Sequence, residues 1–193
     1  MTVYKTILKR RSIRRFKQKP IALSILKKLV DAARYAPSAA NLQPWEFVIV
    51  NKKDVVDELF GFSQWAGYLG KKGAPQAGQL PVSFIVALLN SERCLKPKYA
   101  QADLGAVVQN ILLTATELGL GSCWLGAIDR VGIAKLLNAP KNVSVEYAVA
   151  LGFPDEKSIA EEMKRSHKYY RDKKGMLHVP KRPLAKIIHL NKY

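Results

Sequence analysis

The spacing of apolar residues along the chain predicts four helices. Apolar side chains recur every three or four residues in residues 3–8, 22–35 and 52–60, which is typical of amphipathic helices. Residues 100–119 show the same spacing over more than one stripe of the helix surface. A helix with so much apolar surface has to be covered on several sides, and we expect the sheet and another subunit to cover it.

Shorter apolar runs predict the strands of a sheet. These runs span residues 46–50, 82–89, 122–127 and 145–151. The run at 82–89 is almost continuously apolar, so the strand should be buried on both faces. The sequence therefore predicts an α+β fold, with helices over a central sheet.

Two segments fit neither pattern. Glycine recurs in residues 61–80, which predicts a loop or short mobile helices, and residues 183–188 have the mixed character of an arm that packs elsewhere. No repeat or long linker divides the chain. We therefore expect residues 1–193 to form a single domain.

Composition narrows the class of protein. Of the 193 residues, 48% are apolar, which is enough to support a core. The purest apolar run, residues 84–89, is far shorter than the ~18 residues that a membrane span needs. The start of the chain has no secretory apolar stretch, and Cys94 and Cys123 form no Cys-x-x-Cys pair. We therefore expect a cytoplasmic protein with no membrane partner, no disulfide framework and no metal site.

The positive charge lies at the two ends of the chain. Residues 1–19 carry eight basic side chains and no acidic one, and residues 164–193 carry ten basic side chains and one acidic one. The stretch between them has 14 of each sign, so the whole net charge of +17 comes from the ends. Two basic ends are either tails for nucleic acid or two halves of one anion site.

Common catalytic signatures are absent. Residues 119–124 begin like a dinucleotide fingerprint, but Trp124 stands where the third glycine must be. Residues 67–72 lack the spacing of a phosphate loop, and residues 61–65 lack the closing glycine of a nucleophile elbow. If the protein is an enzyme, its reactive group should therefore arrive with a cofactor.

The histidines and the paired carboxylates of the C-terminal third are expected to be solvated. The histidines lie eleven residues apart, which is no metal-ligand spacing, and the acidic pairs stand in polar surroundings. These residues are His167, His178, His189, Asp155–Glu156 and Glu161–Glu162.

The densest polar motif lies near the N-terminus. In an extended segment, Arg10, Ser12 and Arg14 project to one side and Arg11 and Ile13 to the other. Two guanidiniums that flank a hydroxyl match the oxygens of a phosphate. The alternative is a basic surface turn or a nucleic-acid tail.

Two further segments are suited to a ligand. Between a helix end and a strand, residues 36–45 combine two prolines, small residues and the donors and acceptors of Ser38, Asn41 and Gln43, which suits the polar edge of a planar heterocycle. The alternative is a plain helix-to-strand connection with Trp45 in the core. Residues 123–128 include Gly126, where a ligand can reach exposed backbone, although this signal is weak and a plain buried strand explains the segment better.

Together these segments resemble the nitroreductase family of FMN-dependent oxidoreductases. The resemblance rests chiefly on Arg-Arg-Ser-Ile-Arg at 10–14 and Ala-Pro-Ser-Ala-Ala-Asn-x-Gln-Pro-Trp at 36–45. Supporting matches are Asp-Leu-Gly at 103–105, Gly-Leu-Gly at 119–121, Trp-Leu-Gly at 124–126, Leu-Gly-Phe-Pro at 151–154 and the segment 182–189. The resemblance implies a homodimeric α+β fold with a mostly antiparallel sheet and two FMN sites at the subunit interface.

The resemblance also implies the residues of the site. The FMN phosphate, ribityl chain and pyrimidine edge would be bound by Arg10, Arg11, Ser12 and Arg14. The partner subunit's loop would lie against the ring through Pro37, Ser38, Ala39 and Asn41, with Gln43 as a further polar contact. The segment behind the ring would be Leu125, Gly126 and Ala127, and Lys181 or Arg182 would close the phosphate site.

The implied activity is ping-pong electron transfer from NADH or NADPH to a nitroaromatic, a quinone or a related small acceptor. Arg14 would stabilise the negative charge that develops on the pyrimidine edge. The family often has an Asn and a Lys near the reactive nitrogen, but residues 65–79 do not align with that pattern, and Lys71 and Lys72 are the nearest basic residues.

Two alternatives remain. A reductive dehalogenase or a flavin-fragmenting enzyme would have the same fold. A nucleic-acid-binding protein that uses the basic ends belongs to another class, and the chain lacks the row of stacking aromatics that single-strand binding requires.

Overall fold

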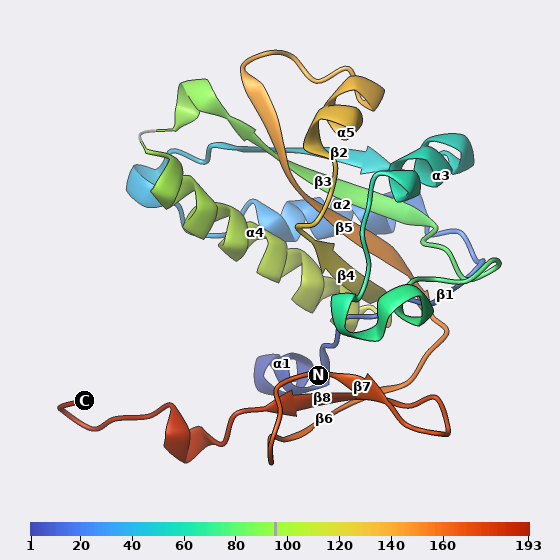
Figure 1. Cartoon of the computed structure of the whole chain (residues 1–193). Coiled ribbons are helices and arrows are strands. Elements are labelled where there is room, and N and C mark those ends of the chain that lie inside the picture. Colours follow the sequence, from blue (N-terminus) through green and yellow to red (C-terminus); the bar gives the residue numbers. More distant parts are fainter. Residues whose placement is uncertain (95) are drawn as a thin grey trace.

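A computed structural model describes residues 1–94 and 96–193 of the chain (Figure 1). The helices are α1 (Val3–Lys9), α2 (Leu23–Ala33), α3 (Lys53–Gly61), α4 (Pro97–Glu117) and α5 (Arg130–Leu136). The strands are β1 (Phe16–Lys17), β2 (Trp45–Val50), β3 (Ser83–Asn90), β4 (Gly121–Leu125), β5 (Val143–Pro154), β6 (Ser158–Glu162), β7 (Tyr170–Arg171) and β8 (Leu177–Lys181). Short 3₁₀ segments span Ala39–Asn41, Gly67–Gly73, Ser91–Arg93 and Leu184–Lys186.

The main sheet is antiparallel throughout. Strand β5 lies at its centre, with β3 and then β2 on one side and both β1 and β4 on the other. Successive residues of β3 point to opposite faces of the sheet, and both faces are covered. Helices α2 and α4 pack on the face of Ile85, and α3 and α5 pack on the face of Phe84. The predicted α+β class and the burial of this strand on both faces are therefore confirmed.

Helix α4 begins and ends earlier than its apolar spacing predicts. Pro97 stands in its first turn, where the missing N–H group of proline costs no hydrogen bond. Gly119 adopts φ of 76° two residues after the end of the helix, a left-handed conformation that glycine adopts without strain. Leu104, Val107 and Ile111 are fully buried against the sheet and α2, as the broad apolar surface of this helix requires.

Two parts of the fold have no counterpart among the predicted elements. Helix α5 follows Asp129, whose carboxylate caps the helix by accepting the amide of Gly132 at 3.0 Å. Strands β6, β8 and β7 form a second, small sheet, in which β6 and β8 run parallel. This small sheet lies beside α1 in Figure 1, and the chain leaves it as an exposed C-terminal arm.

Candidate functional site

The basic N-terminal motif lies extended against the main sheet. Ser12 forms a parallel bridge with Ser122 of β4, and the amide of Ile13 donates to the carbonyl of Ser122 at 2.9 Å. The close approach depends on Gly121, because a Cβ atom there would lie 2.8 Å from Cγ2 of Ile13. The sheet thus fixes the main chain from which the arginines project.

The arginines alternate between two sides, as the extended segment predicts. Arg11 and Ile13 line one pocket of about 270 Å3 together with Leu120 at the end of α4. Arg14 and Arg10 are near the buried thiol of Cys123. Burial raises the pKa of this thiol to about 11, and the two guanidiniums offset the effect only in part. Cys123 is therefore a neutral thiol and no nucleophile at neutral pH.

The two basic ends of the chain meet at Lys181 of β8. Desolvation and the positive charges of Arg10 and Arg11 lower the pKa of the Lys181 ammonium. Burial is the main cause that lowers the pKa of Arg10 and of Arg11. Within the described part of the chain, none of these three cations forms an ion pair with a carboxylate. Such a cluster favours an anionic ligand.

The loop between α2 and β2 is held in a strained conformation. Ala40, Asn41 and Gln43 have φ angles of 50°, 55° and 49°. The hydroxyl of Ser38 accepts the amide of Gln43 at 3.0 Å, and the Gln43 side chain donates to the carbonyl and side-chain oxygens of Asn41 at 3.2 Å. Pro37 precedes this turn and is exposed. Left-handed conformations at three non-glycine residues mark functional loops more often than plain connections.

Helix α4 separates this loop from the basic cluster. The amide of Ala39 donates to the carboxylate of Asp103, in the second turn of α4, at 3.1 Å. Thr116, in the last turn, lines the pocket that contains Arg11. Asp103 and Thr116 are 13 positions apart in the helix, which corresponds to about 20 Å. The loop and the pocket of Arg11 therefore lie at opposite ends of α4, and Figure 1 shows the loop at the opposite end of α4 from β4.

The end of β4 exposes the main chain that the sequence singles out. Leu125 is buried, whereas Gly126 and Ala127 are exposed. The carbonyl of Gly126 accepts a hydrogen bond from Arg130 at 3.2 Å, and the carbonyl of Ala127 accepts the amide of Gln64 at 2.9 Å. Arg182 is exposed at the start of the C-terminal arm. The side chains of Lys71 and Lys72 lie outside the described residues.

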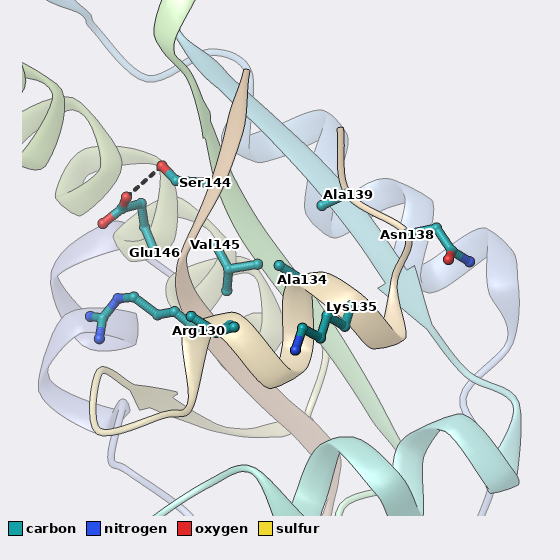
Figure 2. Close-up of a pocket in the computed structure, with 9 residues that line it drawn as sticks. Arg130, Ala134, Lys135, Asn138, Ala139, Ser144, Val145 and Glu146 are labelled. Atoms are coloured by element: carbon teal, nitrogen blue, oxygen red, sulfur yellow. Dashed lines mark hydrogen bonds between the residues drawn. The ribbon is translucent and has the colours of Figure 1, made fainter. Parts of the chain in front are cut away.

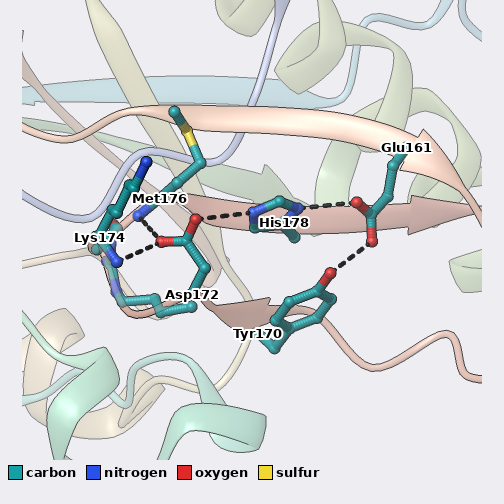
Figure 3. Close-up of polar contacts among 8 residues, drawn as sticks. Glu161, Tyr170, Asp172, Lys174, Met176 and His178 are labelled. Carbon is teal, nitrogen blue, oxygen red and sulfur yellow. Dashed lines mark hydrogen bonds and ion pairs between the residues drawn. The ribbon is translucent and has the colours of Figure 1, made fainter.

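The prediction that the C-terminal acidic pairs and histidines are solvated is wrong for Glu156 and only partly right for His178 and Glu161, which are half-buried. The side chain of Glu156 is 2% exposed and accepts the amide of Arg14 and the guanidinium of Arg171. His178 lies between Glu161 at 2.8 Å and Asp172 at 3.4 Å (Figure 3). These carboxylates raise the pKa of His178. No local sequence pattern indicates these contacts, because each joins separate segments of the chain that meet only through strand pairing in the main sheet or in the small sheet.

Other features lie outside the predicted site. Figure 2 shows a pocket of about 530 Å3 between α5 and β5, lined by Arg130, Lys135 and Glu146 among others and by none of the predicted site residues. Across the two described ranges, no group of histidine, cysteine and carboxylate side chains is arranged to hold a metal ion. No helix in the part of the chain that the structure describes has the length and apolar character to cross a membrane.

Comparison with known proteins decides the family. The model of the nitroreductase family matches residues 7–153, which include the basic motif, the strained loop and the end of β4. The chain belongs to the nitroreductase family. Its matched span ends one residue before the end of β5, so the small sheet and the C-terminal arm of this nitroreductase-family chain lie beyond it.

Relatives and solved structures agree with this membership. An Archaeoglobus fulgidus protein, provisionally named an NADH dehydrogenase/NAD(P)H nitroreductase, is 34% identical over 172 residues, which cover 81% of this chain and 88% of the relative. An FMN-dependent nitroreductase of Clostridium difficile is 27% identical, with a TM-score of 0.70 over 97% of this chain and 98% of its own. A provisionally named nitroreductase of Desulfovibrio desulfuricans, solved in complex with FMN, is 27% identical, with a TM-score of 0.72 over 100% of this chain and 98% of its own.

Proposed function

We propose that this chain is an FMN-dependent oxidoreductase that passes electrons from NADH or NADPH to nitroaromatics, quinones or related small acceptors. The observation that carries the proposal is the convergence of Arg10, Arg11 and Lys181, three cations without a carboxylate partner among the described residues. Family membership and the solved structures described as FMN-dependent or in complex with FMN support the phosphate of FMN as the ligand of this cluster.

The residues present fit FMN. Three cations in a partly desolvated cluster match a phosphate dianion, since hydrogen bonds between charged groups are about twice as strong as neutral ones. Ser12 lies next to this cluster and offers a hydroxyl, and Arg182 follows Lys181 directly. We propose that these residues bind the phosphate and ribityl chain, that Arg14 lies at the pyrimidine edge, and that Leu125, Gly126 and Ala127 back the ring.

In this proposal, each flavin site takes its cations from one chain and its α2–β2 loop from a second copy of the chain. Asp103 holds the loop of Pro37, Ser38, Ala39, Asn41 and Gln43 near one end of α4, about 20 Å along the helix from Thr116, which lines the pocket of Arg11. A homodimer would bring one chain's loop to the other chain's cations. The exposed apolar side chains of α1 and of the C-terminal arm are candidates for this interface: Val3, Ile7, Leu8, Leu184, Ile187, Ile188 and Leu190.

In this proposal, the residues of the chain bind and orient the flavin and stabilise the negative charge that develops on it. When bound, FMN supplies the hydride acceptor and donor. The Arg14 guanidinium donates hydrogen bonds where negative charge develops during reduction, and fixed donors stabilise such charge without reorganising. The buried thiol of Cys123 stays protonated beside Arg14, so it adds no competing negative charge. We place this single-domain enzyme in the cytoplasm, because both of its cysteines are free thiols.

The test is spectroscopic. The purified protein should be yellow, and its flavin absorption should bleach when NADH or NADPH is added without oxygen. Faster bleaching with one nucleotide identifies the electron donor, and a panel of acceptors then identifies the substrate class. A colourless protein that takes up no added FMN would contradict the proposal.

A further inference from the structure

A buried carboxylate connects the small sheet to Arg14. Glu156 follows β5, and its side chain is almost fully buried between the N-terminal motif and β7. One carboxylate oxygen accepts the main-chain amide of Arg14, and the other accepts the guanidinium of Arg171. Both oxygens are therefore engaged by segments that lie far apart in the sequence.

A contribution to folding stability is a poor explanation for the buried ion pair of Glu156 and Arg171. A buried ion pair costs desolvation energy that roughly cancels its Coulomb attraction, and apolar replacements are often neutral or stabilising. Glu156 does more than pair with Arg171, because its hydrogen bond restrains the main chain at Arg14. The next residues reinforce the restraint: the amide of Asp155 donates to the carbonyl of Arg15 at 2.9 Å, and Phe16 pairs with Pro154 in the sheet.

The small sheet also contacts the side chain of Arg14. The guanidinium lies 5.0 Å from the ring centre of Tyr169, directly before β7, in a cation–π contact. Arg171 itself pairs with Leu177 of β8, and its Nη1 donates to the carbonyl of Gly175 at 3.0 Å. The β7 segment thus touches Arg14 at the guanidinium and, through Glu156, at the main chain.

A polar network fixes β7 in turn. In Figure 3, His178 of β8 lies between Glu161 of β6 and Asp172, and the hydroxyl of Tyr170 donates to Glu161 at 3.0 Å. The rings of Tyr170 and His178 stack with their centres 4.8 Å apart. The three strands of the small sheet therefore hold each other, and Arg171 has a fixed base from which to reach Glu156.

We infer that Glu156, held by Arg171, is a positioning residue that sets the orientation of Arg14 and so adjusts the ease with which the bound flavin is reduced. This inference rests on the proposed function, in which Arg14 stabilises negative charge at the pyrimidine edge. It assigns a role to the small sheet, which lies beyond the span that the family model matches.

The test compares Glu156→Gln with Glu58→Gln in the FMN-loaded protein. Glu58 is exposed on α3, so its variant is a matched control for the same chemical change. Glutamine offers one acceptor oxygen and one NH2 group, so either the Arg14 amide or Arg171 meets a donor in place of an acceptor. We expect reduction of bound FMN by the nicotinamide to slow by about tenfold or more in Glu156→Gln, and not in Glu58→Gln.

The midpoint potential of bound FMN separates positioning from a simple charge effect. Loss of a negative charge near the flavin would by itself make reduction easier and raise the potential. Misplacement of Arg14 acts in the opposite direction, and a tenfold fall in the equilibrium constant for reduction corresponds to a fall of about 30 mV for two electrons. A lower potential supports the inference, and an unchanged or higher potential overturns it.

A double-mutant cycle tests whether Glu156 acts through Arg14. In an Arg14→Ala background, Glu156→Gln should no longer lower the potential, and only the rise from the lost charge should remain, whereas independent effects would lower it as in the wild type. Additive effects overturn the inference. Arg171→Met removes the other partner of Glu156 and should lower the potential more in the wild type than in an Arg14→Ala background. The lost charge of Arg171 alone would act equally in both backgrounds, so this comparison keeps the test decisive if Glu156→Gln does not fold.

The outcomes for the wild-type protein distinguish the two proposals. A wild-type protein that takes up no FMN overturns both the proposed function and this inference. A wild-type protein that is loaded and reduced normally, with Glu156→Gln and Arg171→Met equal to Glu58→Gln, overturns the inference alone.

Discussion

The main-chain amide of Ala39 donates a hydrogen bond to the carboxylate of Asp103 at 3.1 Å. Asp103 lies in the second turn of α4 and is 9% exposed, so the contact anchors the α2–β2 loop at the start of the longest helix. The basic cluster lies beside the other end of that helix. In the proposed homodimer, each flavin site therefore takes its cations from one chain and its loop from the other.

Mixing two defective variants tests this shared site. Arg10→Ala damages the basic cluster, and Asp103→Ala removes the acceptor that holds the loop. A hybrid dimer combines both defects in one site and leaves its second site intact. After unfolding and refolding as an equal mixture, about a quarter of all sites should be functional by random pairing. At an FMN concentration that loads the wild type but neither variant, we expect the mixture to show higher FMN-dependent activity than either variant alone, as measured by nicotinamide oxidation.

The control for this experiment is each variant refolded by itself. No recovery in a mixture that size-exclusion chromatography shows to contain dimers would contradict the shared site.

Arg14→Ala should impair flavin reduction more than flavin retention. The guanidinium is proposed to stabilise charge that appears only during reduction, and loss of one such donor costs about 10²-fold or more in rate. Stopped-flow absorbance gives the reduction rate, and a fluorescence titration gives the affinity for FMN. Arg93→Ala, on an exposed ion pair with Glu46, is the control. Equal reduction rates in Arg14→Ala and the wild type would remove Arg14 from this role.

Arg10→Ala and Lys181→Ala should mainly weaken FMN binding. In the proposed site, each variant would remove a charged hydrogen bond to the phosphate, worth about 1.5–3 kcal/mol, or about 10- to 100-fold in affinity. Riboflavin lacks the phosphate, so its affinity should change much less in the same variants. The exposed Lys186→Ala, on the C-terminal arm, serves as the matched control. If riboflavin and FMN lose affinity equally, the cluster does not bind the phosphate.

The small sheet should lose stability as the pH rises above neutrality. Hydrogen bonds to Glu161 and Asp172 raise the pKa of His178 above its ordinary value of 6.5. The protonated imidazole therefore adds to the free energy of unfolding. This contribution is full below pH 6.5 and is lost as the pH rises through the pKa of the folded state. His178→Gln should therefore lower the melting temperature at pH 6 and have less effect at pH 9. His189→Gln, on the exposed arm, should have no effect at either pH. An equal loss at both pH values would show that the charge of His178 is not what stabilises the sheet.

Much of the fold could be predicted from the sequence because burial leaves a local pattern. The continuous apolar run of β3 and the broad apolar surface of α4 each require cover on several sides, and the structure supplies it. The small sheet left no such pattern. Its strand β6 reads Ser-Ile-Ala-Glu-Glu and has only partly buried or exposed positions, so its pairing with β8 depends on contacts across the fold. The burial of Glu156 was missed for the same reason.

The amino-acid sequence alone establishes positive charge at the two ends of the chain, hydrogen-bond donors that complement a phosphate at residues 10–14, and a stiff polar loop at residues 36–45. Charge and residue type are properties of single residues, so they are known before the fold is. Three relationships depend on the fold: Lys181 lies near Arg10 and Arg11, α4 separates the loop from them, and Glu156 accepts the amide of Arg14. These relationships join residues far apart in the chain, and such contacts are set by the packing of whole elements.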